Sequence, residues 1–239
     1  MKARLAAVPD ERMHLVLMMV LTFSTGIIDA VGYLGLDRVF TANMTGNVVI
    51  LGMGLVGAED LPVLGPLLAL GGFMAGAALG GRVLRRAPGP WSALTTWLFL
   101  SVGIVCVALA VVLLVVGATP DPAIALPVTT VLGLAMGVQA ATARFVAVPD
   151  VTTVVVTSTL IGLAADSRLG SGRSAAEGRS LRRFLAVFLI LLGAFVGAFL
   201  LRIEVGLGLL VAAVLIVSAT LVGALHGRLS AGRVPDDAL

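Results

Sequence analysis

Eight long apolar stretches, separated by short polar connections, constrain the fold of this chain more than any other feature. Most of them are about 18 to 27 residues long, and a helix of that length spans the ~30 Å hydrocarbon core of a bilayer. We therefore expect an all-α, polytopic membrane protein in which residues 1–239 form a single membrane domain. The stretches are 14–36, 39–57, 67–84, 91–117, 124–146, 150–165, 184–201 and 205–226.

The composition supports this expectation. Hydrophobic residues make up 59% of the chain and charged residues 12%, with a mean hydropathy of +1.11, whereas a soluble domain carries roughly twice that charge. The net charge of +3 comes mainly from arginines at the ends of apolar stretches, which favours topology signals and anionic lipid contacts over nucleic acid binding. The first stretch contains Asp29 and is too long for a signal peptide, so we expect it to be retained as a helix.

The two halves of the chain resemble each other. "GIIDAVGYL" from Gly26 is similar to "GVQAATARF" from Gly137, and "TANMTGN" from Thr41 is similar to "TVVVTST" from Thr153. "GFMAGAAL" and "GAFVGAFL", each with a GxxxG spacing, follow in the same order. We interpret residues 14–117 and 124–226 as two repeats.

The distribution of basic residues predicts how these repeats cross the membrane, since cytoplasmic loops are enriched in Lys and Arg. If all eight stretches cross, 10 of the 16 basic residues lie inside. If 39–57 and 150–165 instead enter and leave on the same side, 14 of the 16 lie inside and only Arg38 and Arg202 lie outside. Each repeat then has three transmembrane helices plus one re-entrant or broken helical hairpin, and the two repeats are inverted.

Inverted repeats with interrupted helices at matching places are typical of secondary transporters. "TANMTGN" lies on the first interruption, which we predict near residues 43–46, and we predict that Asn43, Thr45 and Asn47 line a solute site. The alternative is that these side chains only satisfy broken backbone and bind neighbouring helices. On the second interruption, Thr153 and Thr157 are the matching candidates, with Thr159 beside them.

Asp29 is the only acidic residue inside a predicted crossing, where a carboxylate costs at least ~2.5–3.5 kcal/mol. It is either a coupling group for protons or cations, or a structural hydrogen-bond acceptor for the hairpin, for example toward Asn43. Gln139 lies near the matching place in the second repeat and is a further candidate for the solute site. Tyr33 and Trp91 fit the aromatic belt at the membrane interface.

We expect no enzymatic activity and no cofactor. Cys106 is the only cysteine and is predicted to be a packed thiol. His14 and His226 lie at opposite ends of the chain, so the sequence assembles no metal site or catalytic dyad from them. A P-loop is absent, which argues against ATP-driven transport by this chain.

The run "TFSTGIIDAVGYLGLDRVFTANMTGNVVILG", with "GLAMGVQAATARFVAVPDVTTVVVTSTLIGLA" in the second half, resembles the YoaK-like family of bacterial membrane proteins. The resemblance extends over roughly residues 14 to 226 and implies a membrane location without an established substrate. The second half departs from the family pattern, which suggests a Thr-Gly pair where Thr157 is followed by Ser158.

We therefore predict a secondary transporter or permease for a small solute, with a site near the bilayer midplane and coupled to protons through Asp29. A passive channel and a non-transporting assembly or regulatory protein are the alternatives. The expected location is the bacterial inner membrane, multi-pass, with both termini cytoplasmic. The expected partners are a small solute and the lipid bilayer, with no nucleic acid, and a homo-oligomer stays open.

Overall fold

The computed structural model describes residues 7–117, 121–148, 156–167 and 179–231. In these residues the secondary structure is helical, as expected. The elements are α2 (Asp10–Gly35), α3 (Met44–Gly54), the short 3₁₀ helix η1 (Ala58–Asp60), α4 (Leu64–Leu84), α5 (Ala93–Val116), α6 (Pro122–Val146), α7 (Val156–Ala165), α8 (Arg179–Leu201) and α9 (Val205–Ala231).

Six of these helices, α2, α4, α5, α6, α8 and α9, are long and apolar enough to cross a membrane, and α3 and α7 are shorter apolar helices. The long helices extend past several predicted ends: α2 begins at Asp10 rather than at residue 14, and α8 begins at Arg179 rather than at residue 184. The reason is that hydropathy marks only the lipid-exposed part of a helix, while helical hydrogen bonding continues into the polar interface.

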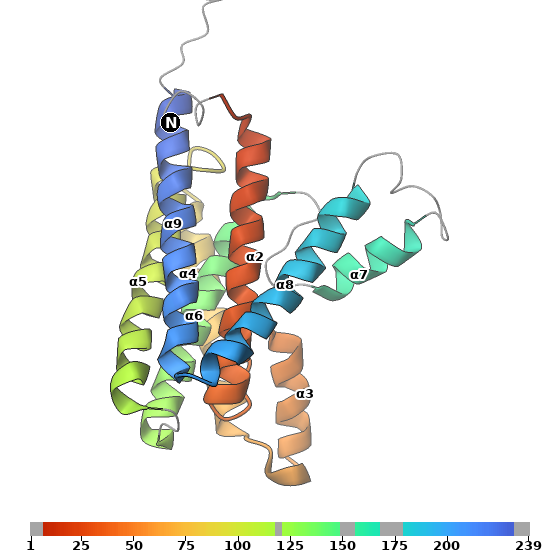
Figure 1. Ribbon diagram of the computed structural model, residues 1–239, viewed down its shortest axis with the longest axis vertical. Coiled ribbons are helices and arrows are strands. Elements are labelled where there is room, and N and C mark those ends of the chain that lie inside the picture. The colour runs from red at the N-terminus through yellow and green to blue at the C-terminus, as the bar shows by residue number, and fades with distance from the viewer. Residues whose placement is uncertain (1–6, 118–120, 149–155, 168–178, 232–239) are drawn as a thin grey trace, which may run out of the picture.

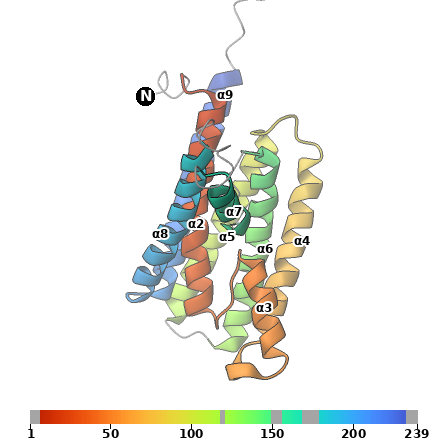
Figure 2. The same cartoon turned by 90° about the vertical axis from the view of Figure 1, so that its right-hand side faces the viewer.

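The six long helices form an elongated bundle (Figure 1). The start of α2, the α4–α5 connection and the end of α9 lie at one end of this bundle, which we call the terminal end. The α2–α3 connection, η1 and the turn between α8 and α9 lie at the opposite end. Helices α2, α5 and α8 therefore run away from the terminal end, and α4, α6 and α9 run toward it (Figure 2).

Local sequence explains where several helices start. Ser92 and Thr95 form a reciprocal capping box at the start of α5. The Asp121 side chain accepts a hydrogen bond from the Ala123 amide, and Pro122 follows it at the first helical position of α6. The central element of the core is α2, whose Met18, Leu21, Ile27 and Ile28 are almost fully buried.

Glycines let two helix pairs pack with their backbones in close contact. A Cβ atom at Gly72 would lie 2.5 Å from the Thr130 carbonyl oxygen, so α4 and α6 touch without intervening side chains. Gly137 of α6 lies in the same way against the Phe73 carbonyl of α4. In the second pair, Gly26 of α2 lies against the backbone of α8, and Gly193 of α8 lies against the backbone of α2. Small residues thus act here as they do at close membrane-helix interfaces.

The segment 39–57 is not a continuous helix. Its helical part, α3, starts at Met44 with Asn43 as the N-cap and ends at Gly54. Residues 39–43 are not helical, so the break reaches only the first residue of the predicted range 43–46, and residues 44–46 already belong to the helix. In the second half, α7 starts at Val156, and residues 149–155 lie outside the described part of the chain. Both short helices lie on the same side of the bundle, α3 packed on α4 and α7 packed on α8 (Figure 2).

Candidate functional site

The chain reverses direction directly after α2. Asp37 and Arg38 both have positive φ angles, 61° and 58°, a backbone conformation that residues other than glycine seldom adopt. The following residues return along α2, where a Cβ atom at Gly32 would lie 2.6 Å from the Val39 carbonyl oxygen. A side chain at Gly32 would therefore push the returning segment away from α2.

The Asp29 carboxylate holds the returning segment in place. Its Oδ1 atom accepts hydrogen bonds from the backbone amides of Thr41 at 3.0 Å, Ala42 at 2.8 Å and Asn43 at 3.4 Å. These amides are not part of a helix, so they would otherwise have no acceptor in an apolar environment. The structure thus gives Asp29 a structural partner in the hairpin, although through the backbone amides around Asn43 rather than through its side chain.

Asn47 closes the other side of the same turn. Its Oδ1 accepts from the Phe40 amide at 2.9 Å, and its Nδ2 donates to the Phe40 carbonyl, so one fully buried side chain satisfies both backbone groups of one residue. The Asn43 side chain accepts from the Gly46 amide at 3.3 Å and caps α3. Tyr33 of α2 stacks on the Phe40 ring with centroids 4.8 Å apart.

The remaining predicted site residues lie in different environments. Thr45 is exposed on the first turn of α3, two residues before buried Asn47, and Thr157 is exposed on α7. Gln139 is fully buried in α6, where its Nε2 donates to Thr25 Oγ1 of α2 at 3.1 Å. Thr153 lies outside the described residues. Asp29, Asn43, Thr45 and Asn47 are therefore brought together on one hairpin, whereas Gln139 joins α6 to α2 through Thr25.

This arrangement is a short non-helical stretch held inside the helix bundle by one carboxylate and one amide side chain. Asp29 lies six residues before the end of α2, which places it about 9 Å in from that end rather than at the middle of the helix. Among the predicted site residues and their neighbours, two buried polar atoms, Thr41 Oγ1 and Gln139 Oε1, have no hydrogen-bond partner in the described part of the chain. The hairpin also leaves the Asn43 side chain and the Thr45 hydroxyl exposed.

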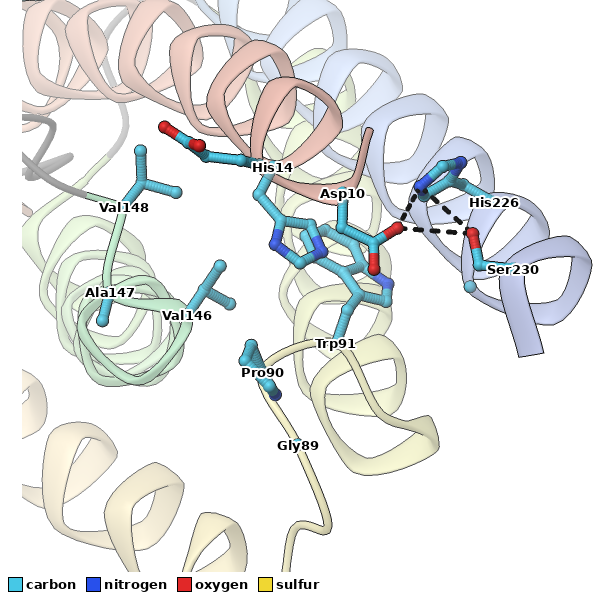
Figure 3. Close-up of a pocket in the computed structure, with 12 residues that line it drawn as sticks. Asp10, His14, Gly89, Pro90, Trp91, Val146, Ala147, Val148, His226 and Ser230 are labelled. Atoms are coloured by element: carbon cyan, nitrogen blue, oxygen red, sulfur yellow. Dashed lines mark hydrogen bonds and ion pairs between the residues drawn. The ribbon is translucent and has the colours of Figure 1, made fainter. Parts of the chain in front are cut away.

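A second polar cluster lies at the terminal end, about 22 Å along α2 from Asp29. His14 of α2 stacks on Trp91, with ring centroids 5.5 Å apart, and His226 Nε2 lies 2.8 Å from Asp10 Oδ1. These residues line a cavity of about 600 Å³ (Figure 3). Trp91 lies just before α5 at this end of the bundle, and its ring packs between His14 and Phe99.

Sequence reasoning missed this cluster because its residues are far apart in the chain. A signal was nevertheless present, since both termini were predicted on the same side of the membrane and each carries a histidine near a helix end. Among the described residues, no group of three or more His, Cys, Asp and Glu residues is placed to hold a metal ion.

The bundle of apolar helices with polar groups inside it defines a multi-pass helical membrane protein. The sequence family described as "Protein of unknown function (DUF1275)" matches residues 17–222, and the chain belongs to this family.

The UPF0700 transmembrane protein YoaK of Bacillus subtilis (strain 168) is 32% identical over 155 residues. That alignment covers 63% of this chain and 65% of the relative, so it spans just under two thirds of the relative's length. No solved structure matches the chain.

Proposed function

We propose that this protein is a secondary transporter or permease for a small solute. One observation carries the proposal: inside the bundle, the backbone of residues 39–43 leaves the helical conformation next to the Asp29 carboxylate. Non-helical backbone at membrane depth is tolerated only where protein buries it or where it lines an aqueous cavity. In transporters such breaks bind the substrate, and polar groups at the start of a half-helix contact it. In this chain those groups are Asn43 and Thr45.

The helix packing supports the inverted repeat that this proposal includes. If residues 14–117 and 124–226 are repeats, α2 corresponds to α6 and α4 corresponds to α8. The close pair α4–α6 then corresponds to the close pair α8–α2, and in both pairs the glycines of the matching sequence segments make the contact. Helices α2 and α6 run in opposite directions (Figure 2), which is the relation that inversion requires.

We place the terminal end in the cytoplasm and the protein in the bacterial inner membrane. Arg85 and Arg86 lie in the α4–α5 connection at that end, whereas Arg38 and Arg202 lie in connections at the opposite end. With this orientation the arginine-rich end faces the cytoplasm, as the positive-inside rule requires. In this proposal the protein is not an enzyme, its partners are the solute and the lipid bilayer, and it binds no nucleic acid.

A second candidate, a non-transporting membrane protein, has a specific observation in its favour. Asp29 and Asn47 both use their hydrogen-bonding capacity on the hairpin backbone, which is what a purely structural role demands. The two candidates differ in the expected role of the exposed groups. A transporter needs Asn43 and Thr45 for solute contact, whereas a structural protein tolerates their replacement.

The test is uptake into proteoliposomes that contain the purified protein and a pH-sensitive dye. The solute panel comprises radiolabelled amino acids, monosaccharides, nucleobases and small organic cations. Thr45→Val removes an exposed hydroxyl at constant volume, and Asn43→Ser keeps an N-cap oxygen while removing the amide. We expect at least one solute to enter faster than into protein-free vesicles, and each variant to reduce its uptake about tenfold without lowering the thermal unfolding temperature.

The matched control is Asp121→Asn, which removes an exposed carboxylate from the N-cap of α6 and should leave uptake unchanged. Uptake equal to that of protein-free vesicles for the whole panel contradicts the transporter proposal and favours the structural candidate. Uptake with no dye response, unaffected by Asp29→Asn, contradicts proton coupling while leaving transport itself in place.

A further inference from the structure

The cavity at the terminal end is built by four separate parts of the chain. The first turns of α2 contribute Asp10, Glu11 and His14, and the end of α9 contributes His226, Gly227 and Ser230. The α4–α5 connection adds Gly89, Pro90 and Trp91, and residues 146–148 at the end of α6 form the remaining wall (Figure 3). Its volume of about 600 Å³ lies within the range of small-molecule sites.

Helix α9, whose last turns line the cavity, packs closely against α5 at its other end. Near the opposite end of the same helix pair, a Cβ atom at Gly206 would lie 2.7 Å from the Ala110 carbonyl oxygen and 2.5 Å from Leu114. Val205 is 2% exposed there, so that end is closed by apolar contacts.

Hydrogen bonds and ring stacking fix the polar lining. Asp10 Oδ1 is bonded to His226 Nε2 at 2.8 Å and accepts from Ser230 Oγ at 3.3 Å, which joins the start of α2 to the end of α9. His226 is 2% exposed, but the Asp10 side chain is 66% exposed, so its carboxylate remains accessible to a further donor. His14 stacks on Trp91, and both side chains are among those that line the cavity (Figure 3).

The acidic groups of the lining favour a cation over an anion, even though the α4–α5 connection at this end of the bundle carries arginines. Asp10 and Glu11 are acidic, and none of the described lining residues is a lysine or an arginine. Glu11 is partly engaged, because Arg182 of α8 lies 3.2 Å from its carboxylate at an exposed position. Asp10 is therefore the principal hydrogen-bond acceptor for a bound cation. Glu11 is a secondary acceptor, because a bound cation competes with Arg182 for its carboxylate. Opposite these groups, Val146 and Val148 offer an apolar wall (Figure 3).

We propose that this cavity binds a small organic ammonium ion. The ammonium group donates to the Asp10 carboxylate and to His14, and its alkyl part lies against Val146 and Val148. Charge-assisted hydrogen bonds to the accessible Asp10 carboxylate contribute to the affinity, and the apolar wall selects an organic cation over a hydrated metal ion. This site is separate from the Asp29 hairpin and does not depend on the proposed transport.

The experiment uses tryptophan fluorescence of the full chain in nanodiscs of zwitterionic lipid. The chain contains two tryptophans, and Trp97 is 67% exposed, so Trp97→Phe leaves Trp91 in the cavity as the reporter. The titrants are n-butylammonium chloride, n-butyramide and sodium butyrate, which share an alkyl chain and differ in charge. We expect a saturable change with butylammonium, at least tenfold weaker binding of butyramide, and no saturable change with butyrate.

Two charge variants locate the site. Asp10→Asn keeps an oxygen for His226 and Ser230 but removes the charge, and we expect it to weaken butylammonium binding about tenfold or more. Glu11→Arg, at a side chain that is 70% exposed, places a cation at the rim and should also weaken binding. Because position 11 tolerates other side chains, this variant tests the proposal even if Asp10→Asn does not fold. Asp121→Asn, far from the cavity, should bind as the Trp97→Phe parent does.

Three results overturn the proposal: no saturable response to butylammonium, equal responses to all three titrants, or wild-type affinity in both Asp10→Asn and Glu11→Arg. Failure here leaves the transport proposal intact, since that is measured by uptake and by variants at Asn43 and Thr45.

Discussion

Asp29 Oδ1 accepts from three backbone amides of the hairpin, so replacing Asp29 is a direct test of the structure. Asp29→Ala removes the acceptor for three backbone amides, two of which, those of Thr41 and Ala42, belong to buried residues. A buried donor left without a partner costs about 1–3 kcal/mol, so we expect the free energy of unfolding to fall by about 2–6 kcal/mol. Asn43 is exposed, and its amide can bind water instead.

Asp29→Asn separates the acceptor from its charge. The amide oxygen can still accept from the same backbone groups, but these bonds lose their charge assistance, which is worth about 1 kcal/mol for each bond. We therefore expect a smaller loss, about 1–3 kcal/mol, and the order of stability wild type, Asn, Ala. Thr45→Ala, at an exposed side chain of the same hairpin, should change the stability by less than about 0.5 kcal/mol.

The assay is unfolding by SDS in mixed micelles, followed by tryptophan fluorescence at a fixed detergent composition. If Asp29→Ala unfolds within about 0.5 kcal/mol of the wild type, the amides of residues 41 and 42 have other partners and the hairpin geometry is wrong. If the Asn and Ala variants are equally destabilised, the lost charge rather than the lost acceptor is responsible. Combined with uptake, the same Asn variant distinguishes a structural acid from a coupling acid, since only a coupling acid changes the dye response while the protein stays folded.

Two further predictions test the packing and the topology. Gly72→Ala should destabilise the bundle by about 1–3 kcal/mol, because its Cβ atom would lie 2.5 Å from the Thr130 carbonyl oxygen. Gly71→Ala, with nothing within 4 Å of its Cβ atom, should be neutral or slightly stabilising. Equal effects of the two variants in the SDS assay would contradict the α4–α6 interface. In a Cys106→Ala background, cysteines at positions 59 and 87 should react with a membrane-impermeant maleimide from opposite sides, position 87 from the cytoplasm. Labelling of both in intact cells would refute the proposed orientation.

Hydropathy and charge predicted the helical class and the six long helices because a bilayer penalises any exposed polar backbone, so few arrangements of apolar sequence are possible. The interruption before Met44 was also predictable, since a continuous helix would place Thr41 and Thr45 on one face and Asn43 and Asn47 on another. The sequence could not predict which backbone groups these side chains satisfy. Asp29 and residue 41 come together only because the chain reverses at Asp37 and Arg38. The residue types at these two positions do not by themselves predict positive φ angles.

The cavity at the terminal end was less predictable for a different reason. Asp10 and His226 become neighbours because antiparallel helices α2 and α9 bring their ends together, and no local spacing in the sequence reports such a contact. The residue type of Trp91 predicts a membrane interface but not the packing partners of its ring. In this fold Gly223 provides room for the indole ring. The cluster could have been predicted by asking which helix ends are expected on the same side of the membrane and listing their polar residues together.

Under the proposed repeat, the two hairpins are held at different points. Asp29 binds the first hairpin at its non-helical start, and the position aligned with it in the second repeat is Ala140, which has no acceptor side chain. The second hairpin is instead bound at the end of its helix, where Arg183 of α8 donates to the Gly162 carbonyl and to Asp166, each at 2.7 Å. Duplicated helix packing therefore supports two chemically different hairpins. In a transporter built this way, Asp29 has no acidic counterpart at the aligned position of the second repeat, so substitutions at Asp29 and at Arg183 should affect different steps. We expect Asp29→Asn to change the coupling to protons and Arg183→Leu to lower the stability of α7 against α8. Identical effects of both variants on uptake and on the dye response would contradict this division.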